Sequence, residues 1–136
     1  MKKTVRKNKV RKFPYGLHDS HINHIKVKEK KFPNAKVKFL FNDGYYVIRN
    51  GEALPVQGNL SFEKVDLDFS NVYIMKISKT NYGKIEGRKY SLKKFAKKFP
   101  NVDMEIIDTT FDGYHCKLSG YLYKKGKIYE FLMDIC

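Results

Sequence analysis

The chain has 136 residues, the length of one ordinary domain that can bury a core without disulfides or metals. Lysine and arginine together number 28 against 14 acidic residues, so the formal net charge is +14 at pH 7. No apolar run approaches the roughly 20 residues of a membrane span or the roughly 7–15 of a signal peptide, so we expect a cytoplasmic protein without membrane contact.

The first dozen residues are basic and polar almost throughout. Seven positive charges lie between Lys2 and Lys12, and Val5 and Val10 are the only apolar side chains after Met1. Because such a segment has too little apolar surface to fold, we predict a disordered basic tail over residues 1–12. The remaining residues, 13–136, show no linker and no repeat, and we expect them to form a single β-rich domain.

Two segments with the two-residue period of a β-strand follow the tail. In residues 22–30, His24 and three lysines alternate with Ile25 and Val27, which predicts a strand with one solvated face. Residues 35–41 repeat the pattern, with apolar side chains on one side and lysines on the other. We therefore expect two neighbouring amphipathic strands.

Turn-forming residues come next, at 42–44 (Asn-Asp-Gly) and at 50–51 (Asn-Gly). Both segments offer the positive backbone φ angles of a tight hairpin. We predict that residues 45–49 form a strand that folds back on the preceding one. Pro55 and Gly58 then limit regular structure in the stretch that follows.

The middle of the chain predicts two more strands. Residues 60–69 contain two alternating runs that change phase near Lys64, as they would at a β-bulge, where one strand has an extra residue. Residues 72–77 are more uniformly apolar, which is typical of a central strand. Residues 81–87 carry an asparagine and two glycines and predict a loop.

One segment has the period of a helix. Ser91 precedes apolar residues spaced i, i+3, i+4 and i+7, and lysines fill the opposite side. We predict a short helix that is capped by Ser91 and ends before Pro100. Its apolar residues are Leu92, Phe95, Ala96 and Phe99.

The C-terminal third predicts a three-stranded meander. Residues 104–110, 114–123 and 127–135 alternate as strands, and Asp-Gly at 112–113 and Lys-Gly at 125–126 separate them. The whole chain therefore predicts a mainly β (α+β) fold: an antiparallel sheet, sandwich or open barrel of seven or eight strands. One short helix, too short to be stable alone in water, packs on this sheet.

Three of the four histidines and an aspartate lie close together, at His18, Asp19, His21 and His24. A metal site needs three or four ligands that converge on one ion. On an extended strand, successive histidines of this set point to opposite faces, and His18 lies about 20 Å from His24. We therefore predict no metal and no catalytic residue, and expect His18 to form a hydrogen bond in the turn before the first strand.

The alternative is a metal-dependent activity at His18, Asp19 and His21. No other pattern indicates an enzyme, because the sequence lacks a Gly-x-Ser-x-Gly nucleophile turn and a Gly-Lys-Ser/Thr phosphate loop. Cys116 and Cys136 match no metal-ligand spacing, which fits structural thiols in a reducing compartment. We predict no cofactor.

Several side chains predict a binding surface. Tyr121 and Tyr123 share one face of a predicted strand, with Lys117 near them in sequence. Lys93 and Lys97 lie on the polar side of the predicted helix. Tyrosine is enriched among the residues that dominate protein interfaces. We predict a non-enzymatic binding or accessory domain whose partner is another protein.

Nucleic acid is the alternative partner. Non-specific binding would use the basic tail and the lysine-rich face, with lysines neutralising phosphates and tyrosines stacking on bases. However, 24 of the 28 basic residues are lysines, and specific phosphate or base contacts favour arginine. The charge excess therefore also fits an AT-rich codon bias.

The segments YGLHDSHINHIKV, FNDGYYV, VDLDFSNVYIM, YSLKKF and LSGYLY resemble those of a group of small uncharacterised bacterial proteins. These proteins begin with a histidine-aspartate-serine motif at the start of the first strand. The resemblance spans about residues 13–135 and implies the same succession of strands. The group has no assigned activity, so the resemblance implies no catalytic residue.

The LHDS segment, with His18 to Ser20, also resembles the opening of immunity proteins from bacterial toxin systems. Those proteins bind and block a toxin. The resemblance implies a non-enzymatic module that binds a protein. The strong positive charge of this chain then implies an acidic partner.

Overall fold

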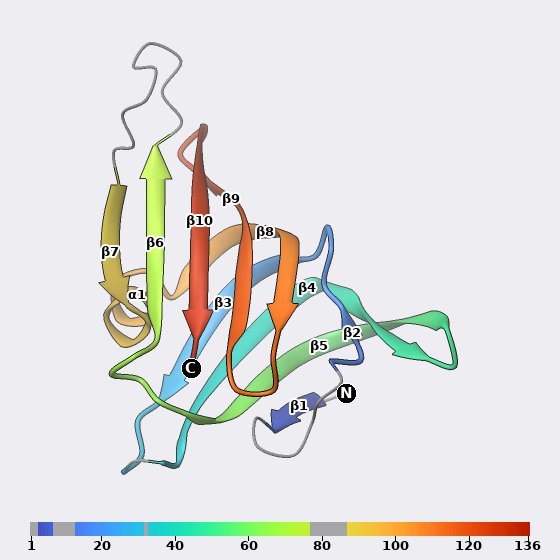
Figure 1. Ribbon diagram of the computed structural model, residues 1–136. Helices are drawn as coiled ribbons and strands as arrows, with labels where there is room; N and C mark the ends of the chain where they lie inside the picture. Colours follow the sequence, from blue (N-terminus) through green and yellow to red (C-terminus); the bar gives the residue numbers. More distant parts are fainter. Residues whose placement is uncertain (1–2, 7–12, 32, 77–86) are drawn as a thin grey trace.

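The computed structural model describes residues 3–6, 13–31, 33–76 and 87–136, and most of them lie in strands (Figure 1). The strands are β1 (Lys3–Arg6), β2 (Tyr15–Gly16), β3 (His21–Lys28), β4 (Ala35–Arg49), β5 (Glu52–Val65), β6 (Asn71–Lys76), β7 (Gly87–Ser91), β8 (Asn101–Phe111), β9 (Cys116–Lys124) and β10 (Lys127–Ile135). A single helix in this part of the chain, α1 (Leu92–Lys98), lies between β7 and β8.

All the strands belong to one open sheet. Nine of them follow the order β1-β5-β4-β3-β8-β9-β10-β6-β7, and β2 pairs with β4 beside this path. Every pairing is antiparallel except that of β1 with β5. The mainly β, antiparallel class with one short helix is therefore confirmed. The prediction of seven or eight strands misses the short strands β1, β2 and β7 and divides β4 into two.

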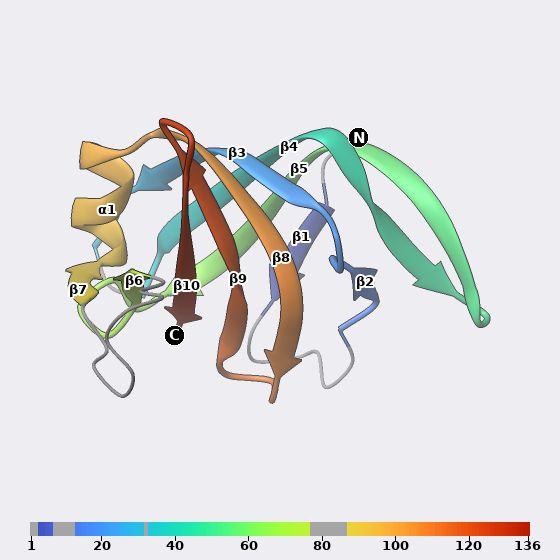
Figure 2. The same ribbon diagram turned by 90° about the horizontal axis from the view of Figure 1, so that it is seen from above.

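The sheet curves so that its two halves face each other. Figures 1 and 2 show β6, β10, β9 and β8 on one side of the molecule and β3, β4 and β5 on the other. The buried side chains between them form one apolar cluster. Phe39 and Phe62 meet edge to face at a centroid distance of 5.6 Å, and Phe131 and Met133 enter from the opposite half. Each such side chain contributes about 1.5–3 kcal/mol by leaving water.

Helix α1 lies at one end of the curved sheet, where it contacts β3, β6 and β7 (Figure 2). The Ser91 hydroxyl accepts a hydrogen bond from the Lys94 amide at 3.1 Å, and the helix ends before Pro100. Leu92, Phe95 and Ala96 are buried under it. The predicted cap, end and apolar face are thus confirmed. No helix of the described chain has the length and apolar character that crossing a membrane requires.

The predicted hairpin at residues 42–44 is wrong. Strand β4 runs straight through these residues, and the pairing with β5 shifts between Phe41 and Tyr45, which makes the segment a bulge. Gly44 has a φ of 80°, and a Cβ there would lie 2.4 Å from the Val56 carbonyl oxygen. A bulge of this kind uses a glycine with a positive φ, and so does a tight turn. The Asn-Asp-Gly segment is therefore compatible with either structure. The chain reverses at Asn50 and Gly51 instead, as the second turn signal predicts.

Strand β5 differs from its prediction in two further ways. It continues through Pro55 and Gly58. Proline has no amide hydrogen to donate, so it is tolerated at the edge of a sheet. At Pro55 one edge of β5 is unpaired within the described chain, because β1 pairs with β5 only from Leu60 onward. The bulge near Lys64, whose φ is 53°, is confirmed. The predicted strand does not extend to residue 69, since residues 67–69 form a turn.

The expectation of a disordered tail is wrong for Lys3–Arg6, which form β1 along residues 60–63 of β5. The edge of β5 presents unpaired backbone groups that a neighbouring extended segment can satisfy. Residues 1–2 and 7–12 of the predicted tail lie outside the described residues. So does most of the predicted loop at 81–87, of which Gly87 begins β7.

The C-terminal meander is confirmed as β8, β9 and β10. Its first pair contains an irregularity that the sequence did not indicate, a register shift between Ile106 and Asp108. There β8 comes so close to β9 that a Cβ on Gly120 would lie 1.9 Å from the Glu105 carbonyl oxygen. Glycine at this position therefore permits the close approach of the two backbones.

We expect Gly120→Ala to destabilise the fold by about 3 kcal/mol, because the added methyl meets backbone rather than a movable side chain. Gly126→Ala is the matched control. Gly126 has a φ of 74° but no atom within 4 Å of the added methyl, so its cost is about 1 kcal/mol. Urea unfolding measures both, and equal losses would contradict the close approach at Gly120.

Candidate functional site

The candidate site is the side of β6, β8, β9 and β10 that faces away from the core. Along these strands, buried residues such as Met104, Leu122 and Met133 alternate with residues that point outward. We call the outward residues the outer face. They are Tyr73, Met75, Asp103, Glu105, Asp108, Lys117, Ser119, Tyr121, Tyr123, Ile128, Glu130, Leu132 and Asp134.

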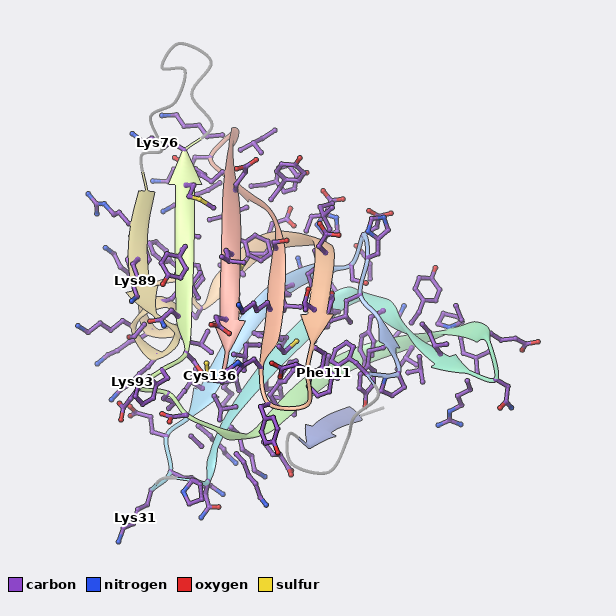
Figure 3. The ribbon with its side chains drawn as sticks, viewed as in Figure 1. Lys31, Lys76, Lys89, Lys93, Phe111 and Cys136 are labelled. Carbon is purple, nitrogen blue, oxygen red and sulfur yellow. The ribbon has the colours of Figure 1, made fainter. Side chains whose placement is uncertain are left out.

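The outer face is acidic although the chain is strongly basic. Its five carboxylates are Asp103, Glu105, Asp108, Glu130 and Asp134, and its one lysine is Lys117. Lys89 borders it on β7, where it pairs with Tyr73 (Figure 3). The formal charge of this face is therefore negative, whereas the net charge of the chain is +14.

Apolar side chains lie between these carboxylates. Tyr121, Ile128 and Leu132 are 36%, 51% and 37% exposed. Cross-strand pairing places Tyr121 opposite Glu130 and Ile128 opposite Tyr123. Exposed aromatic and aliphatic groups on adjacent strands form a continuous contact surface, and protein interfaces are enriched in such surfaces.

One end of the outer face is held by hydrogen bonds. The His21 Nδ1 lies 2.5 Å from Asp103 Oδ1, and its Nε2 lies 3.8 Å from Glu105 Oε2. The Tyr123 hydroxyl donates to Glu105 Oε1 at 2.7 Å, and its ring stacks on that of His21 at a centroid distance of 6.3 Å. The hydrogen bond to Glu105 raises the pKa of Tyr123 above its usual value. These contacts fix the orientations of the His21, Tyr123 and Glu105 side chains.

The structure separates the histidines that the metal hypothesis brings together. The His18 Nδ1 lies 2.8 Å from the Ile107 carbonyl oxygen, and its Nε2 lies 3.3 Å from Asp19 Oδ2. His21 instead contacts Asp103 on the outer face. In the part of the chain that the structure describes, no three His, Cys, Asp or Glu side chains are grouped so that they could hold a metal ion.

The expectation that His21 and His24 face opposite sides is wrong. The pairing of β3 with β8 shifts between Ile22 and His24, and Ile22 and Ile25 are both buried. This bulge places His21 and His24 on the same side of the sheet. They still have separate partners, since the His24 Nδ1 lies 2.9 Å from Asn101 Oδ1. A two-residue period predicts orientation only while the strand is regular.

Three of the five predicted binding residues lie together. Tyr121, Tyr123 and Lys117 all belong to the outer face. Lys93 and Lys97 lie on α1 instead, and Lys93 forms an ion pair with Glu29 that raises its pKa. The two helix lysines therefore belong to a different surface.

The carboxylates of the outer face were not recognised from the sequence. They are distributed over residues 103–134, and their shared face depends on the pairing of three strands. The one signal within a strand is the spacing of Asp103 and Glu105, and of Glu130 and Asp134, on one side of the two-residue period.

Neither cysteine forms a disulfide. Burial raises the pKa of the Cys116 thiol to about 12. A thiol with such a pKa stays protonated at neutral pH and is a poor nucleophile. Cys116 therefore packs as a core residue rather than as a reactive group.

No protein-family model, no curated protein and no solved structure matches this chain.

The turn at His18 gives a prediction about pH. The hydrogen bond to the Ile107 carbonyl, and then the charge of Asp19, raise the pKa of His18 above its usual value of 6.5. Protonated His18 therefore contributes fully to the free energy of unfolding below about pH 6.5, the pKa of the unfolded chain. This contribution is lost as the pH rises through the higher pKa of the folded state. An NMR titration should show this raised pKa, and Asp19→Asn should lower it. An unchanged pKa in Asp19→Asn would contradict the contact.

Proposed function

We propose that this chain is a non-enzymatic binding domain whose outer face binds a basic, partly apolar segment of another protein. The observation that carries the proposal is the gathering of five carboxylates around exposed tyrosine and aliphatic side chains in a chain of charge +14.

Two kinds of contact support such a partner. Apolar side chains of the partner would cover Tyr121, Ile128 and Leu132, which gains about 25 cal/mol for each Å² of apolar surface removed from water. Lysine or arginine side chains would then reach Glu130 and Asp134 around them. Such charges contribute mainly to orientation and to the rejection of wrong partners.

The net charge of the domain does not prevent this binding. At physiological ionic strength the screening length is about 8 Å, so a segment in contact with the outer face interacts chiefly with the nearby carboxylates. The charge does slow the approach of a basic partner at low salt, because electrostatic steering acts at long range.

The partner proposed here differs from the one that the overall charge implies. The likeness to immunity proteins, together with a net charge of +14, implies an acidic partner. The outer face has the opposite sign, so we propose a basic partner for the same kind of non-enzymatic module. The carboxylates also disfavour the approach of nucleic-acid phosphates to Tyr121 and Tyr123.

A synthetic peptide in which lysine alternates with leucine tests the proposal. We expect chemical-shift changes centred on β9 and β10 in an NMR titration. Tyr121→Ala should weaken binding by about tenfold, because it removes a central aromatic anchor. Glu130→Gln should weaken it by about threefold, the loss of one exposed charge contact.

Glu52→Gln is the matched control, because it removes the same charge from the β4–β5 hairpin, far from the outer face (Figure 1). It should leave the affinity unchanged. A loss equal to that of Glu130→Gln would refute a local site. Tighter binding of a peptide with glutamate in place of lysine would refute the basic partner.

A further inference from the structure

A pocket lies between α1 and the inner side of β6, β7, β9 and β10. Its volume is about 550 Å³, which is within the range of roughly 300–1,000 Å³ for small-molecule sites. Most of it lies on the opposite side of the sheet from the outer face, because its residues Lys76, Tyr129 and Leu122 occupy inward positions of their strands. Tyr123 borders both regions, and the pocket shares no other residue with the outer face.

Aromatic rings form one wall of the pocket. Tyr90, Phe95 and Phe99 pack against one another with centroid distances of 5.3 to 5.9 Å. Tyr129 and Leu122 line the sheet side. Such walls favour an apolar ligand body, and ring faces favour a flat one.

Four cationic side chains also line the pocket. They are Lys76, Arg88, Lys98 and Lys124, and no carboxylate lines the pocket among the described residues. In Figure 3, Lys76 lies at the end of β6, which is also the end where β9 turns into β10. Within the described chain, none of the four forms an ion pair with a carboxylate.

Two of these cations approach the same ring. The Lys124 Nζ lies 4.3 Å and the Lys98 Nζ 5.5 Å from the centroid of Phe99. The attraction of a cation for a ring face holds both ammonium groups beside the apolar wall. No carboxylate among the described lining residues offsets the positive charge of these ammonium groups, and a bound anion would supply the missing negative charge.

We propose that this pocket binds a small organic anion that consists of an apolar ring system and a charged group such as a phosphate. The ring would contact Tyr90, Phe99 and Tyr129. The charged group would contact Arg88, Lys98 and Lys124. Four cations with no carboxylate beside them among the described lining residues favour a group with more than one negative charge. Arg88 adds the planar fork that binds phosphate oxygens in pairs.

Isothermal titration calorimetry with 1-naphthyl phosphate tests this assignment, with inorganic phosphate and 1-naphthol as the two halves of the probe. We expect the whole probe to bind at least about tenfold more tightly than either half, since each half makes only one kind of contact. Lys98→Gln and Arg88→Gln should each weaken binding by about tenfold, the loss of one hydrogen bond to a charged group.

Lys97→Gln is the matched control. It removes the same charge from the neighbouring position of α1, and Lys97 is exposed and does not line the pocket. Its affinity should equal that of the unmodified protein. If Lys97→Gln binds 1-naphthyl phosphate as weakly as Lys98→Gln does, the probe is attracted only by the net charge of the protein and the proposal fails. It also fails if inorganic phosphate binds as tightly as 1-naphthyl phosphate.

Discussion

The structure depends on one constraint: a single sheet must bury its own apolar face. A flat sheet with one helix of seven residues would leave most of that face in water. The sheet curves instead, so that residues such as Phe39 and Phe131 share one cluster. Register shifts in β3, β4 and β8 mark bulges, and bulges bend a strand and increase its twist. Gly44 and Gly120 allow backbones to approach at two of them.

The same alternation that builds the core also creates two surfaces of opposite charge. Successive residues of a strand point to opposite sides, so Tyr123 faces outward toward Glu105 while Lys124 faces inward toward Phe99. The outer face collects carboxylates, and the pocket beside α1 collects cations. One sheet thus separates a face rich in carboxylates from a pocket rich in cations, and we propose that these bind a basic peptide and a small anion.

Local sequence signals were sufficient where neighbouring residues decide the structure. The cap at Ser91, the reversal at Asn50 and Gly51, and the three-stranded meander were predicted because each depends on a few consecutive residues. The Asn-Asp-Gly segment was misread because Gly44 satisfies a bulge as well as a turn. The segment forms a bulge rather than a turn because β5 pairs with β4 on both sides of it. Strand β5 lies farther along the chain, so the local segment does not contain this information.

The amino-acid sequence by itself determined the class of the fold, the helix and the tyrosines of the outer face, because hydrophobic period and turn chemistry act over a few residues. Only the tertiary structure decided which charges share a surface. Asp103 and Glu130 are far apart in sequence and lie on the same face of the sheet through the register of β8, β9 and β10. Likewise, Lys98 and Lys124 meet at Phe99 only because α1 packs against the curved sheet. Strand register and helix packing depend on the shape of the whole core, which no local pattern contains.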